Sequence, residues 1–305
     1  MTTLRLATRK SEMALLQANM VASALQQAHP GLTIELVKCS TKGDEITDRP
    51  LADIGGKALF VKTLQRALIE DRADLAVHSV KDMPAALDPH FSLAGVLPRP
   101  TAADAFVSHR YPTFADLPQG AIVGTSSPRR QAQIKKLRPD LRVESVRGNV
   151  QTRLAKLDDG LMDALLLSAA GLESLSLSDR ISEVLPLDAF FPAAGQGSVG
   201  IEVMTERTDM QAYVTPINHA ASFCTVSAER ALVAALHGDC HSPIAAHATV
   251  SEGQVHLCGW VGNADGSQTL IAEVTGHAHQ PEHCGQHCAQ QLNVQGAQAL
   301  LQEQR

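Results

Sequence analysis

The chain has 305 residues, 44% of them hydrophobic and 19% charged, with a formal net charge of −6. This length allows two or three domains with hydrophobic cores, and no run of about 18 apolar residues predicts a membrane helix. Aromatic residues make up only 3% of the chain, which supplies few base-stacking surfaces and disfavours nucleic-acid binding.

The N-terminal residues read directly as a strand and contain no apolar stretch of the kind that export signals have. We therefore expect a cytoplasmic protein whose six cysteines are reduced thiols.

The first part of the chain alternates between strand and helix patterns. Residues 4–7 predict a strand, Ser11 is a candidate N-cap for a helix that runs to about residue 27, and residues 32–37 predict a second strand. A strand, helix and strand in this order predict a parallel sheet.

Residues 41–57 show no sustained period and contain three glycines and a proline. A segment of this length is typical of a functional lid or of a disordered loop. Phe60 opens the next helix, either as a core residue or as an aromatic that folds over a ligand.

A dense polar segment, HSVKDMP at 78–84, follows a buried strand predicted at 74–77. Ligands of open α/β sheets bind beyond the carboxyl ends of strands, so this segment is well placed for a site. Lys81 and Asp82 can be a surface ion pair. In the functional interpretation, Lys81 holds a substrate anion while Asp82 manages protons or faces a cationic intermediate.

Prolines near residues 98–100 and 186–192 mark two crossovers between α/β segments. Between them, strands and helices alternate, with strands at 121–124, 141–145 and 163–167 and helices at 127–137 and 149–157. Gln196 lies in a glycine-rich turn that leads to a strand at 199–203. Two lobes joined in this way predict a cleft, as in bilobal binding proteins.

A helix at 225–236, three alternating strands within 244–275 and a helix from about 281 predict a smaller α+β unit. The expected fold class is thus α/β with three domains. The expected domains are residues 1–98 with 198–216 (first lobe, with a lid at 42–60), 103–192 (second lobe) and 220–305 (α+β domain).

The segment 124–153 carries eight lysines and arginines against two acids, although the whole chain is acidic. Two predicted helix starts lie within it: hydroxyl caps at 125–127 with Pro128 at the first turn, and a second start that Asn149 caps. The free N–H groups of a helix start bind anions. Arginines beside them suit a ligand with several carboxylates or phosphates, whereas the alternative is a pair of solvated helices. The candidate binding residues are Thr125, Ser126, Ser127, Arg129, Arg130, Arg147, Gly148 and Arg153.

Cys240 lies in a glycine-containing loop, where a thiol is accessible and where His237 or His241 could assist its ionisation. The alternative is a loop residue without chemistry. Further along, His283 with His287 and Cys284 with Cys288 form i,i+4 pairs that a helix would align for zinc or nickel. They lack the Cys-x-x-Cys spacing of structural zinc sites, so we expect no physiological metal.

Seven segments resemble one family, the porphobilinogen deaminases, also called hydroxymethylbilane synthases. They span nearly the whole chain in the family's order. The segments are LRLATRKSE (4–12), GGKALFVKTL (55–64), ADLAVHSVKDMP (73–84), VGTSSPRRQAQ (123–133), RGNVQTRLAKLDDG (147–160), PAAGQGSVGIE (192–202) and GDCHSPIAA (238–246).

The resemblance implies a transferase of tetrapyrrole biosynthesis that joins four porphobilinogen molecules head to tail into hydroxymethylbilane and releases ammonia. It implies two periplasmic-binding-protein-like lobes, the first discontinuous, and a dipyrromethane cofactor that is held through a thioether to Cys240 and acts as primer. Asp82 matches the catalytic carboxylate, which can stabilise the cation left after deamination and help proton transfer at the pyrrole nitrogens.

The remaining matched residues are implied to bind the cofactor or substrate carboxylates, with Phe60 near the cofactor ring. They are Arg9, Ser11, Phe60, Lys81, Thr125, Ser126, Ser127, Arg129, Arg130, Arg147, Gly148, Arg153 and Gln196. We expect a monomer that acts on porphobilinogen, without nucleic-acid or membrane partners. Two alternatives are a bilobal anion-binding or sensing module without catalysis, and a nucleic-acid binder that uses the basic segment.

The chain departs from the family pattern at several positions. Asp239 and His241 flank Cys240 where Gly and Gln are usual, and either could change the reactivity of the cofactor. Ser174 stands where many relatives place a substrate-binding arginine, so that role is not carried over to this chain.

Overall fold

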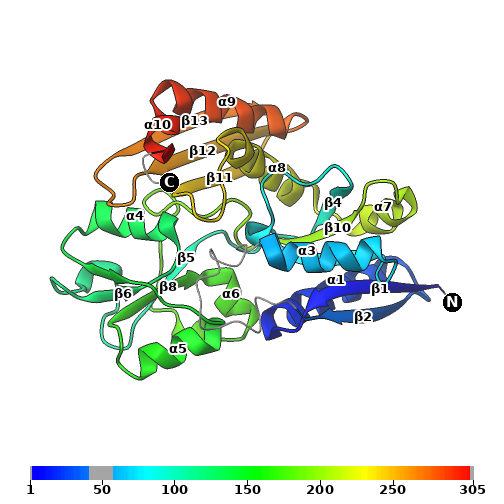
Figure 1. Ribbon diagram of the computed structural model, residues 1–305, viewed down its shortest axis with the longest axis horizontal. Helices are drawn as coiled ribbons and strands as arrows, with labels where there is room; N and C mark the ends of the chain where they lie inside the picture. The colour runs from blue at the N-terminus through cyan, green and yellow to red at the C-terminus, as the bar shows by residue number, and fades with distance from the viewer. Residues whose placement is uncertain (1, 41–57, 303–305) are drawn as a thin grey trace. The chain divides into compact units, whose positions relative to one another are not determined.

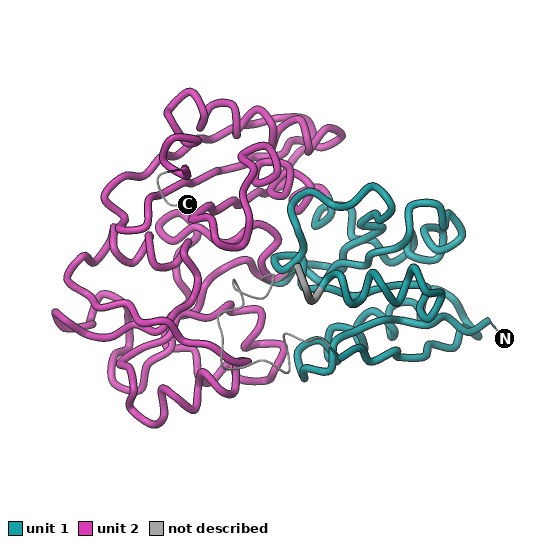
Figure 2. Tube along the Cα trace, viewed as in Figure 1, with its two compact units in different colours: residues 1–100, 198–223 teal, residues 101–197, 224–305 magenta. Residues whose placement is uncertain are grey.

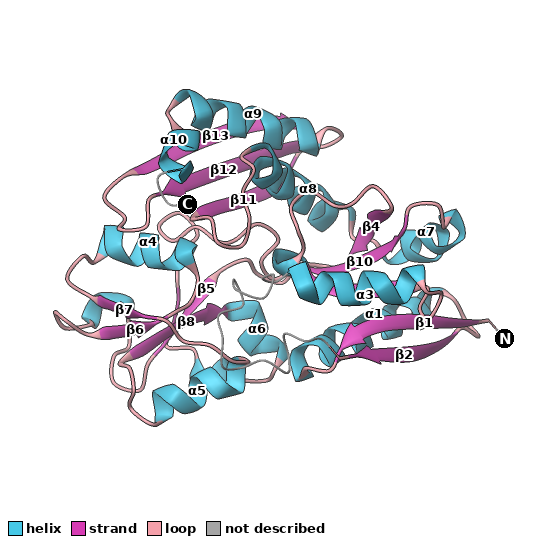
Figure 3. Cartoon of the chain, viewed as in Figure 1, coloured by secondary structure: helices cyan, strands magenta, loops and turns pink. Residues whose placement is uncertain are grey.

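The computed structural model describes residues 2–40 and 58–302, and these form two compact units (Figure 2). Unit 1 comprises the described residues up to Pro100 together with residues 198–223, and unit 2 comprises residues 101–197 and 224–302. Each unit is built around β-sheets with helices packed on them (Figure 3).

Unit 1 contains one five-stranded sheet with the order β2-β1-β3-β10-β4. Strand β1 pairs in parallel with β2 and β3, whereas β10 runs antiparallel between β3 and β4. The strands are β1 (Thr3–Arg9), β2 (Thr33–Cys39), β3 (Leu75–Ser79), β4 (Phe91–Val96) and β10 (Val199–Met204), and the helices are α1 (Glu12–Ala28), α3 (Ala58–Ile69) and α7 (Thr208–Val214).

Alternation along β1 decides which helix covers which face of this sheet. Leu4 and Leu6 belong to a buried cluster with residues of α1 and α7, whereas Ala7 packs with residues of α3 on the other face. Helix α1 begins where the sequence predicts, because Ser11 accepts a hydrogen bond from the backbone N–H of Ala14 at 3.4 Å.

The first sheet of unit 2 repeats this plan with the order β7-β6-β8-β5-β9. Strand β5, which follows the first crossover, runs antiparallel between β8 and β9, as β10 does between β3 and β4. The strands are β5 (Asp104–Val107), β6 (Ile122–Gly124), β7 (Arg142–Glu144), β8 (Ala164–Ser168) and β9 (Glu183–Val184), and the helices are α4 (Pro128–Leu137), α5 (Val150–Asp158) and α6 (Ala169–Ser174).

The second sheet of unit 2 is an antiparallel meander, β11-β12-β13. Helix α9 lies over β12 and β13 (Figure 1), and α8 leads into the sheet. The elements are α8 (Ala220–Ala235), β11 (Ile244–Ser251), β12 (Gln254–Gly262), β13 (Thr269–His277), α9 (Pro281–Val294) and α10 (Ala297–Gln302). The expected fold class is confirmed: two α/β lobes, the first discontinuous, and a small α+β part. The domain boundaries stay a prediction.

The sequence patterns missed β4 and β9 and placed the start of α8 at residue 225, whereas it begins at Ala220. Strand β4 shows three consecutive half-buried residues and therefore lacks the alternation that marks a strand. Strand β9 has only two residues, too few to show any period.

Helix α4 joins the two sheets of unit 2. Ala132 of α4 packs with Ala245 and Trp260 of the meander, and Lys136 donates to the Thr269 hydroxyl at 2.6 Å. The β12–β13 turn also lies against this helix, because a Cβ on Gly266 would collide with the Ala132 carbonyl and approach the Lys136 nitrogen to 2.5 Å. The arginines at the start of α4 are therefore held on a helix that the C-terminal sheet supports.

A buried ion cluster fastens the start of α4 to β5. Asp104 is 0% exposed and accepts from Arg129 Nη1 at 2.7 Å and from Arg130 Nη2 at 2.6 Å. Burial by itself would raise the pKa of Asp104, but the two guanidinium groups hold it well below its ordinary value. The carboxylate therefore stays ionised at physiological pH.

Gly266→Ala is expected to destabilise the full chain more than Gly253→Ala. Both glycines have positive φ, +72° and +74°, so each alanine carries a similar backbone strain of about 1–2 kcal/mol. Gly253 has no atom within 4 Å of an added Cβ, whereas at Gly266 overpacking against α4 adds roughly 1–3 kcal/mol. Denaturant unfolding of both variants measures the difference, and equal losses would show that the turn does not press on α4.

Asp104→Asn is expected to lower the free energy of unfolding by about 3–5 kcal/mol, because it leaves two buried guanidinium groups without a counter-charge. Asp140→Asn is the matched control. Asp140 also pairs with an arginine, Arg138, at 2.7 Å, but both side chains remain partly exposed to solvent, so its loss should change stability less. Urea titrations at neutral pH compare the two, and a small effect of Asp104→Asn would contradict the assignment.

Candidate functional site

The candidate residues of unit 1 meet at one edge of its sheet. Arg9 is the last residue of β1, and Lys81 and Asp82 lie in a 3₁₀ turn, Val80–Asp82, directly after β3. Because β1 and β3 are adjacent and parallel, their carboxyl ends lie side by side. Ser11 follows at the start of α1. All four residues are therefore at the strand ends where α/β sheets bind ligands.

A buried network that the sequence analysis missed supports this edge. His78, the residue before the end of β3, contacts Glu202 of β10 through Nε2 at 2.9 Å, and Gln65 of α3 donates to the same carboxylate at 2.8 Å. Glu202 is 0% exposed. The turn that carries Asp82 is further held by a hydrogen bond from Val80 N to Ser198 O at 3.0 Å. The sequence signal for this buried network was a histidine and a glutamate within otherwise apolar strands.

The candidate residues of unit 2 cluster around the start of α4. Ser127 is the N-cap and accepts from Arg130 N at 3.5 Å, with Pro128 at the first turn, as the sequence predicts. The hydroxyl of buried Thr125 accepts from Ser127 N at 3.2 Å. Ser126 donates to the Val146 carbonyl at 2.6 Å, which ties this loop to the segment that leads into α5.

The two arginines that follow are buried, at 3% and 6% exposure. Arg129 donates to Asp104 and to the Phe191 carbonyl, and Arg130 donates to Asp104 and, at 2.9 Å, to the Leu166 carbonyl. Among the described residues, Arg129 Nε has no hydrogen-bond partner. One carboxylate faces two guanidinium groups here, so the cluster carries a surplus positive charge. Sequence reasoning missed Asp104, whose signal was an acid within the apolar strand DAFV.

Gln196 joins this cluster from the second crossover and is 1% exposed. Its Nε2 donates to the Ala102 carbonyl at 2.7 Å and to Asp104 Oδ1 at 3.0 Å, and its Oε1 lies 3.5 Å from Arg130 Nη2. In this arrangement the Gln196 amide contacts the ion cluster and orients its carboxylate.

The second arginine group lies at the start of α5, which Asn149 caps by accepting from Thr152 N at 2.8 Å. Arg147 is exposed, and Arg153 is half-buried and donates to the Gly148 carbonyl at 2.9 Å. Gly148 has φ +113°, and a Cβ there would meet the Thr152 side chain at 2.6 Å, so the turn requires glycine. These residues present charge to solvent, unlike Arg129 and Arg130.

Cys240 lies in the exposed loop between α8 and β11. Asp239 organises this loop, because its Oδ1 accepts from His241 N and from the Ser242 hydroxyl, both at 2.9 Å. Partial burial would raise the pKa of Asp239, but these hydrogen bonds hold it below its ordinary value.

The other five cysteines are protected by the fold. All six lie within the described residues; Cys39, Cys224, Cys284 and Cys288 are buried, and Cys258 is half-buried. Burial raises the pKa of Cys258 to about 11 and that of Cys288 to about 12, which keeps both thiols protonated at neutral pH. Cys240 is therefore the exposed thiol among the six.

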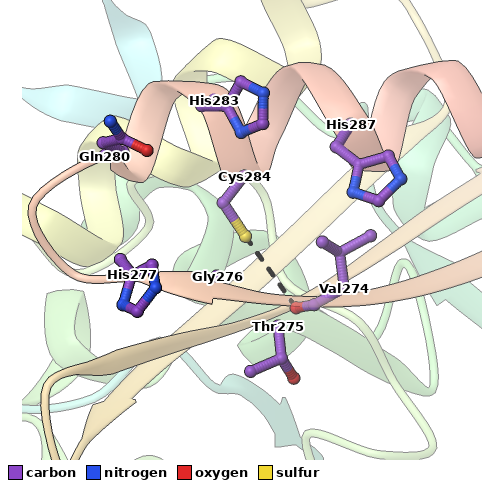
Figure 4. A pocket seen from close by; sticks show the side chains of 8 residues that line it. All are labelled: Val274, Thr275, Gly276, His277, Gln280, His283, Cys284 and His287. Atoms are coloured by element: carbon purple, nitrogen blue, oxygen red, sulfur yellow. Dashed lines mark hydrogen bonds between the residues drawn. The ribbon is translucent and has the colours of Figure 1, made fainter.

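The histidine- and cysteine-rich tail lines a pocket of about 240 Å³ between β13 and α9 (Figure 4). Cys284 turns inward, with Sγ 3.8 Å from the Val274 carbonyl, while the rings of His277, His283 and His287 lie apart from one another. Within residues 2–40 and 58–302, no group of three or more His, Cys, Asp or Glu side chains is arranged to hold a metal ion.

Some predicted features fall outside what the structure describes. Most of the expected lid at 42–60 lies outside the described residues, and only the backbone of its last residues, at the start of α3, is described. The side chain of Phe60 is not among the described side chains. In the described part of the chain, no helix has the length and apolar character needed to cross a bilayer.

Comparisons with known proteins assign this chain to a family. A family model described as "Porphobilinogen deaminase, dipyromethane cofactor binding domain" matches residues 4–212, and another, "Porphobilinogen deaminase, C-terminal domain", matches residues 223–293. A porphobilinogen deaminase of Stenotrophomonas maltophilia (strain K279a) is 50% identical over 301 residues, which is 99% of each chain.

Solved structures that match the chain include immunogenic lipoprotein A from Vibrio vulnificus, at 12% identity and a TM-score of 0.44 over 73% of this chain and 98% of that one. The Bordetella pertussis BvgS periplasmic VFT2 domain matches at 15% identity and a TM-score of 0.42, over 70% of this chain and 85% of that one. Two family models that together span most of the sequence, and a relative half identical along its whole length, lead to one conclusion: the chain belongs to the porphobilinogen deaminase family.

Proposed function

We propose that this protein is a hydroxymethylbilane synthase, which joins four porphobilinogen molecules head to tail and is primed on a dipyrromethane group attached to Cys240. One observation carries the proposal. In this family member, unit 2 contains both an accessible thiol and a buried ion cluster with surplus positive charge. A thiol without that cluster could tether a pyrrole but could not hold its carboxylates.

The residues of unit 2 fit such a group. Each pyrrole carries an acetate and a propionate, so the bound chain is strongly anionic, and the surplus charge of the Asp104 cluster has the opposite sign. Arg129 Nε is a buried donor that finds no acceptor among the described residues, and a ligand carboxylate would supply one. When bound, the dipyrromethane supplies the pyrrole α-carbon at which the chain is extended.

The binding roles are divided among the remaining candidates by their exposure. At the start of α5, Arg147 is exposed and Arg153 is half-buried, so both suit carboxylates of incoming pyrroles. The residues proposed to bind cofactor or substrate are Arg9, Ser11, Phe60, Lys81, Thr125, Ser126, Ser127, Arg129, Arg130, Arg147, Gly148, Arg153 and Gln196. Thr125 and Gln196 do so by holding the backbone and the ion cluster in place.

Asp82 is proposed as the catalytic carboxylate. Each extension breaks the C–N bond of the porphobilinogen aminomethyl group, releases ammonia, and forms a C–C bond to a pyrrole α-carbon that then loses its proton. Positive charge develops on the pyrrole ring as ammonia leaves, and a fixed carboxylate stabilises it. The same carboxylate can accept the pyrrole N–H or the released proton. Arg9 ends β1 and Lys81 and Asp82 follow β3, its parallel neighbour, which supports this role.

We further propose that the enzyme is a cytoplasmic monomer. The six cysteines are free thiols, which supports a reducing compartment. The second candidate function, an anion-binding or sensing module without catalysis, has no use for an accessible cysteine in a loop that its own aspartate organises.

Protein purified from a host that makes porphobilinogen is expected to be heavier than its sequence by one dipyrrole adduct, measured by mass spectrometry of the denatured chain. Cys240→Ser should lose this adduct, because it removes the only exposed thiol among the six cysteines. Cys258→Ser is the matched control in the same sheet region and should keep it. An unmodified wild-type chain would refute the proposed function, and an unchanged adduct in Cys240→Ser would refute the attachment site.

Asp82→Asn is expected to keep the adduct but to lower kcat by about 100-fold or more, because the amide neither neutralises the developing cation nor accepts a proton at neutral pH. Asp88→Asn is the control: this exposed carboxylate lies in the same β3–β4 connection and accepts from His90 N at 3.0 Å. Steady-state release of ammonia and formation of hydroxymethylbilane measure both variants. Near-normal turnover of Asp82→Asn would remove Asp82 from the mechanism.

A further inference from the structure

Glu229 of α8 is a fully buried carboxylate, 0% exposed, in unit 2. It contacts two segments that are distant in the chain. Its Oε2 accepts from Gly195 N at 2.7 Å, and its Oε1 accepts from Ala248 N at 2.9 Å. Gly195 belongs to the second crossover and Ala248 to β11. One side chain therefore joins a helix, a strand and a crossover turn.

The first of these contacts leads directly to the arginines. Gly195 adopts φ +70° and precedes Gln196, whose amide donates to Asp104 Oδ1 at 3.0 Å. Asp104 in turn holds Arg129 and Arg130. The turn itself is tight, since a Cβ on Gly197 would collide with the Thr101 carbonyl. A displacement of Gly195 would therefore be passed to Gln196 and to the carboxylate that orients both guanidinium groups.

The second contact leads to the cysteine. Helix α8 ends at Ala235 and β11 begins at Ile244, so these two elements hold the loop that carries Cys240 at its two ends. Glu229 lies on α8 and accepts a hydrogen bond from a backbone N–H of β11. Strand β11 is an edge strand of its sheet, so its outward N–H groups need partners. The crossover provides one of them, because Ala246 N donates to the Pro192 carbonyl at 3.1 Å, and Glu229 provides another for Ala248 N.

We propose that Glu229 is a positioning residue, which fixes the Cys240 loop relative to the Gln196–Asp104–Arg130 cluster. A ligand tethered at the loop can then place its carboxylates at the arginines. This inference rests on the proposed function. A tethered ligand gains affinity only when the distance between its two attachment points matches its own length. A rigid link between those points is therefore needed, and a buried carboxylate with two backbone donors supplies it.

Glu229→Gln tests the link with little change in volume, because it places an amide NH₂ against one of the two backbone N–H groups. A buried donor left without an acceptor destabilises its local arrangement, so the adduct-bearing fraction in the intact mass spectrum is expected to fall at least about fivefold. In the molecules that carry the adduct, KM for porphobilinogen should rise about fivefold or more while kcat stays within about twofold. Glu273→Gln, an exposed position on β13, is the matched control and should match the wild type in all three.

A purely structural role predicts a different pattern. The variant would melt at a lower temperature, but its folded molecules would carry the adduct in wild-type proportion and show the wild-type KM. That result overturns the proposal. If Glu229→Gln does not fold, Glu229→Asp takes its place, since it keeps the charge but is one methylene too short to reach both donors.

The route through the crossover has its own test. Gln196→Ala should also raise KM, and the double variant with Glu229→Gln should raise it no further than the larger single effect, because both act on the same link. Additive effects would refute this route. If the unmutated protein carries no adduct, the proposed function fails. If it carries the adduct, and Glu229→Gln has the same adduct-bearing fraction and the same KM, only the role of Glu229 fails.

Discussion

The buried pairing of Asp104 with Arg129 and Arg130 is the constraint on which the second unit depends. Three charged groups without access to solvent are unfavourable unless each has partners, and the surrounding backbone supplies them: carbonyls of Phe191 and Leu166, and the amide of Gln196. Strand β5, helix α4, strand β8 and the second crossover must therefore stay in place together. The same cluster keeps one positive charge in surplus, which supports the proposed role of its arginines in binding carboxylates.

The two units contribute different chemistry to the proposed reaction. In unit 1, parallel neighbours β1 and β3 bring Arg9, Lys81 and Asp82 to one edge, with the His78–Glu202 pair buried behind them. In unit 2, hydroxyls, guanidinium groups and a thiol are set on helix starts and a loop. Cys240 is the exposed thiol among the six, whereas the other five are buried or half-buried and burial raises the pKa values of Cys258 and Cys288. This difference supports Cys240 as the proposed attachment point.

The departures from the family pattern have local structural explanations. Asp239 accepts from His241 N and the Ser242 hydroxyl within the cysteine loop, contacts that the glycine usual at this position has no side chain to make. Ser174 donates its hydroxyl to the Ala170 carbonyl at 2.7 Å, one turn back in α6. The Ser174 hydroxyl is therefore engaged with the backbone of its own helix.

Much of the fold was determined by the sequence alone, because its signals are local. Capping by Ser11, Ser127 and Asn149, proline at the start of α4 and alternation along the meander all act within a few residues, and the structure confirms them. The basic segment and the loop cysteine were also visible as patterns. Only the tertiary structure decided that Arg129 and Arg130 are buried on Asp104 whereas Arg147 is exposed, and that Glu229 meets Gly195 and Ala248. Burial and partners of a charged side chain depend on elements distant in the chain, and no local pattern specifies them.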